Sequence, residues 1–213
     1  MLTVHHLGVS QSERIVWLCE ELAIPYELKR YERDRVTRLA PPEFKALHPI
    51  GSAPVITDGD RVLAESAAIV EYLLAKHGNG RLSLPADDPH FADYLYWFHF
   101  ANGTLQPAMG RNMMLGRVGA AADHPVIVGA NARLARALSL LDQRLATVPW
   151  LAGSAFTAAD IMTVFSLTTM RYFLPTDLSA YPNVLAYLQR VAAREGYQRA
   201  MAKGDPGMAL LLT

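Results

Sequence analysis

The pair Ala53-Pro54 stands directly before two short strand-like segments that an Asp-Gly turn joins. The segments PVIT (54–57) and RVLA (61–64) are apolar and have the length of short strands. The intervening Asp58-Gly59 favours the positive φ of a tight antiparallel turn. A proline at such a position can adopt the cis form, which marks a sharp turn of the backbone. The chain is therefore expected to turn sharply into an antiparallel hairpin.

The segments around this hairpin alternate between strand and helix patterns over the first 78 residues. Residues 2–7 and 26–31 have the pattern of strands, and the apolar residues between them recur at helical spacing. A proline pair at 41–42 begins a short helix, and Ser66 opens a longer one after the hairpin. The predicted order is βαβ-ββα.

A stretch rich in glycine, proline and polar residues, GNGRLSLPADDP at 78–89, interrupts this pattern. Only helical spacing follows it. Four helices are predicted there: one over roughly 90–115 that is bent or interrupted near Pro107, one carrying Leu134 to Leu145, one from about Thr157, and one containing Val184 to Val191. We therefore predict an α/β domain at 1–78, a linker at 79–88 and an all-helical domain at 89–213.

Composition and charge limit the class of protein. The 20 basic and 20 acidic residues among 213 cancel, so the broad positive field that suits nucleic acids or anionic membranes is missing. No segment reaches the roughly 20 apolar residues of a membrane span, and the first residues lack a secretory signal pattern. The single cysteine, Cys19, excludes an internal disulfide, and the seven histidines are not spaced as metal ligands. We expect a soluble cytoplasmic protein without a metal, whose specificity comes from a local site.

Four sequence motifs in this order carry a family resemblance. They are SQSERIVWLCEEL (10–22), HPIGSAPVITDG (48–59), ESAAIVEYL (65–73) and FTAADI (156–161). Together with the α/β-then-helical order, they make nearly the whole chain resemble the cytosolic glutathione transferases, which have a thioredoxin-like domain followed by a helical bundle. The segments up to LAPPEFK at 39–45 are most similar to a bacterial and fungal group with a serine in the first loop. Within FTAADI, Thr157 and Asp160 resemble the capping box that starts a buried helix in this superfamily.

The resemblance implies where glutathione, the co-substrate, binds. In thioredoxin-like domains the cis turn presents the backbone of the preceding residue, here Ala53 before Pro54, to the cysteinyl unit of the peptide. The pair Glu65-Ser66 is predicted where a strand ends and a helix starts, a position that favours a carboxylate. Ser66 is expected to hold the γ-glutamyl carboxylate and Glu65 the ammonium group. Taken alone, Ser66 suits an N-cap and Glu65 a solvated first-turn acid, but the fold order favours the binding site.

Two more residues belong to the expected binding loop. Related sequences commonly carry lysine or glutamine where this chain has Ser52, so the contact with the glycyl end of glutathione is expected to be weaker. His48 is a candidate hydrogen-bond partner of the ligand, and a surface histidine before proline is the alternative.

Ser10 is the candidate catalytic residue. The thiolate is the nucleophile, and lowering a thiol pKa from about 8.5 to about 6.5 takes roughly 2.7 kcal/mol, which one hydrogen bond to the anion can supply. Ser10 follows the first predicted strand and opens a Ser-Gln-x-x-Arg run that resembles the serine-type members. It would donate to the sulfur. Ser10 and Glu13 also match an S-x-x-E capping box, and Ser12 is the alternative donor.

The electrophile is expected between the domains, against the helical part. Aromatic and methionine side chains between 97 and 114 offer an adaptable apolar surface, which suits a substrate pocket but equally a core or a dimer interface. The candidates named for the pocket are Met109, Met113 and Tyr172. Cys19 lies on the apolar face of the first helix and is expected to be a buried hydrophobe.

The predicted function is that of a glutathione transferase. The thiolate would attack an apolar electrophile, or reduce a hydroperoxide in a glutathione-dependent peroxidase reaction. The resemblance also implies a detoxifying homodimer whose interface involves the third helix and the start of the long fourth one, with no nucleic-acid or membrane partner. The alternative is a non-catalytic scaffold of the same fold, which loss of Pro54 or of Glu65-Ser66 would indicate. Both features are present, so the enzyme is favoured, while the physiological electrophile stays open.

Overall fold

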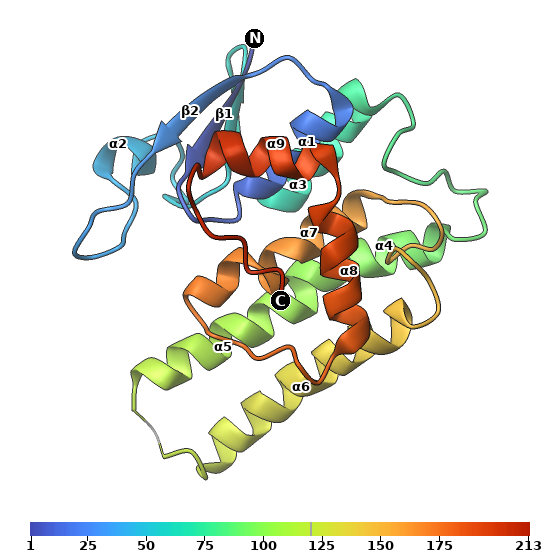
Figure 1. Cartoon of the computed structure of the whole chain (residues 1–213). Coiled ribbons are helices and arrows are strands. Elements are labelled where there is room, and N and C mark those ends of the chain that lie inside the picture. Colours follow the sequence, from blue (N-terminus) through green and yellow to red (C-terminus); the bar gives the residue numbers. More distant parts are fainter. Residues whose placement is uncertain (120) are drawn as a thin grey trace. The chain divides into compact units, whose positions relative to one another are not determined.

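The computed structural model describes residues 1–119 and 121–213, which form two compact units (Figure 1). The first unit comprises Met1–Ser83 and Ala192–Leu210, and the second comprises Leu84–Val191 and Leu211–Thr213. This division differs from the predicted one at residues 192–210, which the sequence assigns to the helical domain and the structure to the first unit.

A four-stranded sheet in the order β2-β1-β3-β4 forms the centre of the first unit. Its strands are β1 (Leu2–Leu7), β2 (Glu27–Tyr31), β3 (Val55–Asp58) and β4 (Arg61–Ala64). β1 runs parallel to β2 and antiparallel to β3, while β3 and β4 form the hairpin. The βαβ-ββα order and the antiparallel hairpin predicted from the sequence are confirmed.

Three helices follow the strands in the predicted order. They are α1 (Glu13–Leu22) after β1, α2 (Pro42–Lys45) after β2, and α3 (Ser66–Leu73) after β4, which continues into a π-helical turn at Leu74–Gly78. α1 is buried along most of its length, and its apolar residues Ile15, Leu18 and Cys19 are fully buried. The helical spacing of these apolar residues in the sequence therefore predicts correctly which face of α1 packs into the core.

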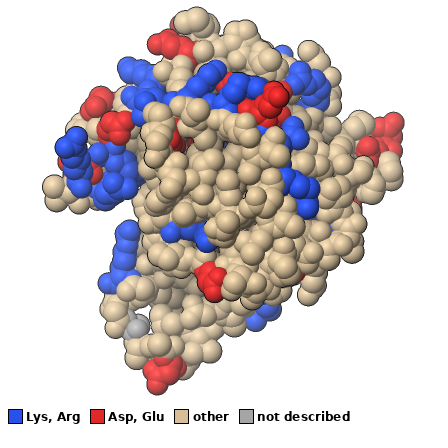
Figure 2. All heavy atoms as spheres, in the orientation of Figure 1, with Lys and Arg blue, Asp and Glu red and all other residues tan. Residues whose placement is uncertain are grey.

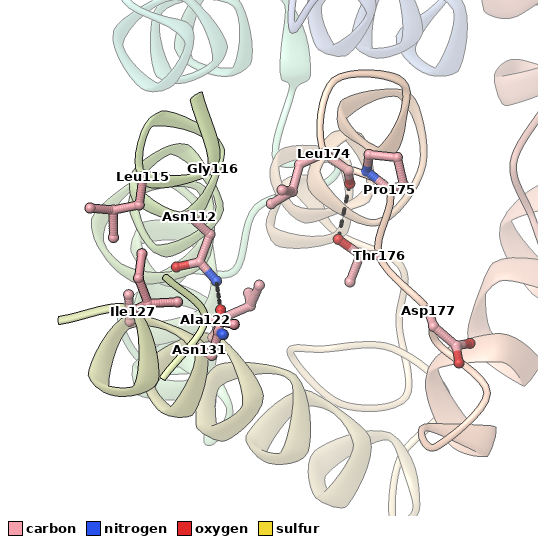
Figure 3. Close-up of a pocket in the computed structure, with 12 residues that line it drawn as sticks. Asn112, Leu115, Gly116, Ala122, Ile127, Asn131, Leu174, Pro175, Thr176 and Asp177 are labelled. Carbon is pink, nitrogen blue, oxygen red and sulfur yellow. Dashed lines mark hydrogen bonds between the residues drawn. The ribbon is translucent and has the colours of Figure 1, made fainter. Parts of the chain in front are cut away.

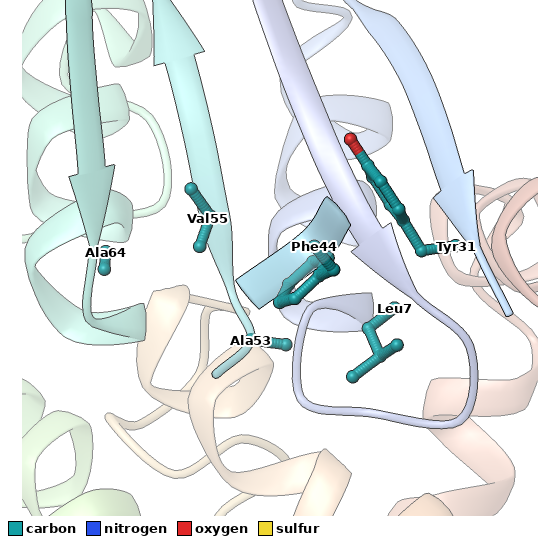
Figure 4. Packing of buried hydrophobic residues seen from close by; sticks show 6 residues of the cluster. All are labelled: Leu7, Tyr31, Phe44, Ala53, Val55 and Ala64. Atoms are coloured by element: carbon teal, nitrogen blue, oxygen red, sulfur yellow. The ribbon is translucent and has the colours of Figure 1, made fainter. Parts of the chain in front are cut away.

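A cluster of buried apolar side chains fixes the loop before β3 (Figure 4). Its members come from the sheet, from α2 and from that loop: Leu7, Tyr31, Phe44, Ala53, Val55 and Ala64. The rings of Tyr31 and Phe44 meet edge to face with their centroids 5.1 Å apart. Because Ala53 is packed into this cluster, the position of its backbone is well determined by the core.

Helices build the second unit. They are α4 (Phe91–Phe100), α5 (Gln106–Arg117), α6 (Pro125–Leu145), α7 (Ala158–Leu167), a 3₁₀-helix (Thr169–Tyr172) and α8 (Pro182–Ala192). A π-helical turn at Ala101–Leu105 separates α4 from α5 just before Pro107, so the predicted interruption is confirmed. No described helix has the length and apolar character needed to cross a lipid bilayer.

α7 begins with the predicted capping box. Asp160 Oδ2 accepts a hydrogen bond of 2.9 Å from Thr157 N–H, and Oδ1 accepts from Leu151 N–H at 3.0 Å and from the Tyr187 hydroxyl at 3.1 Å. Burial raises the pKa of Asp160 to about 6, although these hydrogen bonds act in the opposite direction. Since every residue of α7 is buried, the role of this box is structural, as expected.

The last helix, α9 (Glu195–Gly204), packs against α1 within the first unit. Arg194 binds Glu21 through two hydrogen bonds of 2.8 Å, across 173 positions of sequence. Tyr197 meets Trp17 edge to face with centroids 4.9 Å apart. Figure 2 shows basic and acidic side chains side by side over the face where α9 lies in Figure 1. No helix is predicted here from the sequence, because the partner of α9 lies at the other end of the chain.

Candidate active site

The loop before β3 carries the backbone of Ala53. The Ala53-Pro54 peptide bond is cis, and the paired part of β3 begins at Val55. The Ala53 carbonyl accepts a hydrogen bond of 2.8 Å from the side-chain amide of Gln11. A carbonyl oxygen has two lone pairs, so it can accept a second donor.

Gln11 belongs to a polar network that leads to Ser66. Arg14 Nη1 donates to Gln11 Oε1 at 2.9 Å and to Ser66 Oγ at 3.2 Å. The Arg14 side chain is fully buried, and burial lowers its pKa to about 9, so the guanidinium stays charged at neutral pH. A fixed positive charge therefore lies directly beside the Ser66 hydroxyl.

Glu65 and Ser66 join β4 to α3. Glu65 has a φ of 71°, in the left-handed region that residues other than glycine rarely occupy. Residues held in such conformations cluster at functional sites. Glu65 is the N-cap of α3 and Ser66 is the first residue inside the helix, so the alternative reading of Ser66 as an N-cap is wrong. Its hydroxyl contacts Arg14 instead.

Ser10 and Ser12 lie together in the loop between β1 and α1. Their hydroxyl oxygens are 2.7 Å apart, and Ser12 N–H donates to Ser10 Oγ at 3.2 Å. Ser12 Oγ also lies 2.9 Å from Nδ1 of His6. Ser10 retains 4% of its accessible surface and Ser12 retains none. Ser10 is therefore the less buried residue of the pair.

The capping-box alternative for Ser10 and Glu13 is wrong in one respect: the Ser10 hydroxyl does not accept from the Glu13 N–H. α1 begins at Glu13 with Ser12 as its N-cap, and Glu13 N–H donates to the backbone carbonyl of Ser10 at 3.1 Å. Because this main-chain bond closes the turn, the Ser10 hydroxyl is released for its contact with Ser12.

Two residues that the sequence did not single out, His6 and Asp205, extend this network. His6 Nε2 lies 3.1 Å from Asp205 Oδ2, and Asp205 Oδ1 accepts from Val9 N–H at 2.8 Å. Burial disfavours the charged carboxylate, but the hydrogen bond and charge of His6 and the Val9 N–H hold the pKa of Asp205 below its ordinary value. Ser12, His6 and Asp205 have the composition of a hydrolase triad, yet Ser12 is fully buried and so is not a nucleophile.

The other predicted residues lie as follows. His48 is partly buried, and its Nδ1 accepts from Ile50 N–H at 3.2 Å. Ser52 is exposed in the same loop. Cys19 is fully buried, and burial together with the charge of Glu20 raises the pKa of its thiol to about 12, so it is inert at neutral pH.

The second unit contains a cavity of about 440 Å³ (Figure 3). Its walls come from α5, from α6 and from the segment after the 3₁₀-helix, and include Asn112, Leu115, Ile127, Asn131, Pro175 and Thr176. Asn112 Nδ2 donates to Asn131 Oδ1 at 3.0 Å across one wall. A cavity of this size with apolar walls and few polar groups suits a small molecule.

The three side chains predicted to contact the electrophile lie in the same unit but are not among the residues that line this cavity. Met109 is buried in α5, with 1% of its surface exposed, and Met113 is partly buried. Tyr172 ends the 3₁₀-helix and is 43% exposed. Their contact with the electrophile stays a prediction.

Comparisons with known proteins identify the family of this chain. Residues 10–76 match the family model described as Glutathione S-transferase, N-terminal domain, and residues 99–195 match the corresponding C-terminal domain. Glutathione S-transferase 3 of Schizosaccharomyces pombe is 32% identical over an alignment that covers 100% of this chain and 92% of the relative. The chain belongs to the glutathione S-transferase family.

Solved structures extend the likeness to the three-dimensional fold. A glutathione S-transferase from Actinobacillus pleuropneumoniae superposes on this member of the family with a TM-score of 0.87 at 33% identity, covering 96% of this chain and 93% of that one. A family member from Pseudomonas fluorescens, described as having two glutathione bound, superposes with a TM-score of 0.76 at 24% identity, covering 94% and 92%. The mixed sheet of four strands followed by a helical unit is thus the glutathione S-transferase fold.

Proposed function

We propose that Ser10 of this glutathione transferase donates a hydrogen bond to the thiolate of its co-substrate, glutathione. The observation that supports this role is the position of the Ser10 hydroxyl at the outer end of the hydrogen-bonded series with Ser12 and His6. Ser12 is the poorer candidate, because its hydroxyl is fully buried and already has several protein contacts. This proposal places the chain among the serine-type members.

The residues around Ser10 suit the rest of the peptide. The Ala53 backbone precedes the paired part of β3 and can pair with the cysteinyl unit as a neighbouring strand would. The first turn of α3 and the buried charge of Arg14 favour a carboxylate at Ser66, so we assign the γ-glutamyl carboxylate to that position. Glu65 then accepts from the ammonium group on the same glutamyl unit.

The energy required is within the reach of this loop. A shift of the thiol pKa from about 8.5 to about 6.5 corresponds to roughly 2.7 kcal/mol. A hydrogen bond to a charged group contributes about 1.5–3 kcal/mol, and the N-terminus of α1 adds about 0.3–1 kcal/mol. One serine at the start of a helix is therefore sufficient.

The activated thiolate supports two reactions. In conjugation, the thiol proton goes to solvent, sulfur forms a bond to an electrophilic carbon, and the leaving group departs with its electron pair. In peroxide reduction, sulfur attacks the terminal oxygen of the hydroperoxide, the O–O bond breaks to leave a sulfenic acid, and the departing alkoxide takes a proton from solvent to become an alcohol. A second glutathione then condenses with the sulfenic acid to give the disulfide and water.

We propose that the cavity between α5 and α6 binds a small apolar molecule, while Met109, Met113 and Tyr172 remain the candidates for contact with the electrophile. The apolar wall of the cavity with Leu115 and Ile127 suits an apolar molecule, while Asn112 and Asn131 supply a polar edge. Replacing Ile127, which is partly buried, with tryptophan would fill the cavity. We expect this variant to weaken the binding of small apolar ligands to this cavity several-fold and to leave the Kd for glutathione unchanged.

The exposed face of α4 supports the proposal of a homodimer. A shallow apolar groove there is lined by Leu95, Tyr96, His99, Phe100, Gly103 and Thr104. Leu95 and Tyr96 are 39% and 52% exposed and lie together in this groove, and a contiguous exposed apolar patch is typical of a protein–protein contact. We expect the native chain to sediment as a dimer and the Tyr96→Glu variant to sediment as single chains in analytical ultracentrifugation. A cytoplasmic location and a role in detoxification stay predictions from the family.

Steady-state kinetics of Ser10→Ala test the proposed mechanism. With an activated aryl halide as electrophile, we expect kcat to fall about 10- to 100-fold, the equivalent of one hydrogen bond to an anion, while glutathione binding changes little. Ser154→Ala, an exposed serine in the second unit, is the matched control. Parallel assays with a hydroperoxide decide which of the two reactions the enzyme favours. An unchanged kcat for Ser10→Ala in both assays would remove this residue from the mechanism.

A further inference from the structure

The hydrogen-bonded series from Ser10 to Asp205 has two complete arrangements. A serine hydroxyl donates one hydrogen bond and accepts two. Ser12 Oγ accepts one from Leu7 N–H at 3.2 Å, and its two shortest contacts are Ser10 Oγ at 2.7 Å and His6 Nδ1 at 2.9 Å. Its contact with the Leu7 carbonyl, at 3.3 Å, is longer. Because Leu7 N–H takes one of its two acceptor positions, Ser12 Oγ can accept from only one of these two neighbours, and its own proton goes to the other neighbour or to the Leu7 carbonyl.

In the first arrangement the ring of His6 is neutral. Its Nε2–H donates to the ionised Asp205, so Nδ1 has a lone pair and accepts from the Ser12 hydroxyl. Ser12 Oγ then accepts from the Ser10 hydroxyl. The proton of Ser10 is directed into the protein, and Ser10 offers only an acceptor to a ligand.

In the second arrangement His6 carries one more proton. Its Nε2–H donates to Asp205 and its Nδ1–H donates to Ser12 Oγ. Together with Leu7 N–H this fills both acceptor positions of Ser12, so Ser10 can no longer donate to it, and the Ser12 hydroxyl can donate to Ser10 Oγ. Ser10 Oγ also accepts from Ser12 N–H, which fills both of its acceptor positions. The proton of Ser10 is then free to point outward, where an anionic sulfur accepts it.

We propose that His6 is an imidazolium paired with Asp205 when glutathione is bound as the thiolate, and that it turns the Ser10 hydroxyl toward the sulfur through Ser12. This inference rests on the proposed role of Ser10. His6 and Asp205 touch neither the peptide nor the electrophile in this account, so they are positioning residues. Through them, the direction in which the Ser10 hydroxyl donates depends on the buried His6–Asp205 ion pair.

Close packing at the end of α9 positions Asp205 beside His6. Gly204 lies against the His6 ring, and a Cβ added there would be 3.2 Å from Nε2, closer than ordinary packing allows. Asp205 Oδ1 also binds the N–H of Val9, whose φ of 51° is rare for a β-branched residue. Asp205 therefore holds both the histidine and the strained loop that carries Ser10.

The other charged groups near the pair come from β2 and the segment after it. Arg33 donates to the carbonyls of Gly8 and Val9, and its charge interacts favourably with Asp205. The charge of Arg30 also favours the ionised form of Asp205. The Glu32 carboxylate lies near Gly8, since one of its oxygens would be 3.9 Å from a Cβ built on that residue. Among the described residues of the series, His6 is the one whose ring can hold a proton on one nitrogen or on both, so its protonation state sets the direction of the series.

A pH profile of Asp205→Asn tests this mechanism. In the native enzyme, loss of the His6 proton turns Ser10 inward, so kcat should fall about tenfold or more on the alkaline side. In Asp205→Asn the introduced amide oxygen can still accept from Val9 N–H, and the amide nitrogen donates to His6 Nε2. The neutral ring must then carry its proton on Nδ1, which keeps Ser10 outward at every pH. The alkaline fall should disappear, whereas the exposed Asp60→Asn control should keep it.

Two further results separate this inference from the proposed function. If Ser10→Ala has the kcat and pH profile of the native enzyme, the role of Ser10 fails and the inference fails with it. If Ser10→Ala is impaired but Asp205→Asn keeps the alkaline fall, only the inference is overturned. Nitrogen NMR of His6 in the native full chain with glutathione bound needs no variant to fold. Two protonated ring nitrogens support the proposal, and a lone pair on Nδ1 while the thiolate is present overturns it.

Discussion

Removal of the Ser66 hydroxyl should weaken glutathione binding without blocking it. Ser66 is 2% exposed, and its Oγ lies 3.2 Å from the buried Arg14 guanidinium. A hydrogen bond from a hydroxyl to a carboxylate contributes about 1.5–3 kcal/mol, which is a factor of about 10 to 150 in Kd. The amide groups of the first turn of α3 and the charge of Arg14 remain in Ser66→Ala, so part of the affinity should persist.

Titration calorimetry of glutathione into the native chain, Ser66→Ala and the exposed control Ser154→Ala measures this effect. A glutathione analogue in which the γ-glutamyl carboxylate is an amide supplies the second arm. The native chain should bind the analogue more weakly than glutathione, and the difference in affinity between the two ligands should be smaller in Ser66→Ala, because the contact between the hydroxyl and the carboxylate is already missing there. A Kd for Ser66→Ala within twofold of the native value would show that the carboxylate binds elsewhere.

Three further predictions concern other parts of the chain. Cys19 should resist alkylation in the native state and react only on unfolding, because it is fully buried and burial raises its thiol pKa to about 12. Mass spectrometry after iodoacetamide treatment checks this. Rapid labelling of the native protein would contradict the packing of α1. Asp160→Ala should lower the free energy of unfolding by about 3 kcal/mol, since it leaves buried donors at Leu151 and Thr157 without their acceptor; urea unfolding measures it, and a loss under 1 kcal/mol would refute the capping role. Gly196→Ala should lower the free energy of unfolding by about 1–3 kcal/mol, because its Cβ would lie 2.5 Å from the Glu21 carboxyl carbon. The control Gly129→Ala, at an exposed position with open space around it, should not destabilise the protein. Equal effects of the two substitutions would contradict the packing of α9 against α1.

Local pattern was enough to predict most of the fold. The hairpin, the order of the strands and the start of α7 each depend on residues close together in the sequence, such as Asp58-Gly59 or Thr157 with Asp160. The loop with Ala53 and the pair Glu65-Ser66 could be proposed for the same reason, once the motifs stood in the order of a known family. The geometry of these short segments is set by turn chemistry and capping, which the sequence displays directly.

The residues that the sequence did not reveal act over long separations. His6 and Asp205 lie 199 positions apart, and Asp205 follows a helix whose contact with α1 no local pattern announces. Arg14 has the same character: its position in the helix predicts a surface charge as readily as a buried guanidinium beside Ser66. The S-x-x-E spacing of Ser10 and Glu13 misled in the opposite way, since a main-chain bond took the place of the hydroxyl.

The most direct test of the account is the pKa of the glutathione thiol while it is bound. The ultraviolet absorbance of the thiolate can be titrated in the native enzyme and in Ser10→Ala, at glutathione concentrations that saturate both. The account predicts a bound thiol pKa about two units below the free value of about 8.5 in the native enzyme, and a return of most of that shift in Ser10→Ala. Binding of glutathione with an unshifted thiol pKa, or a shift that Ser10→Ala leaves intact, would contradict it.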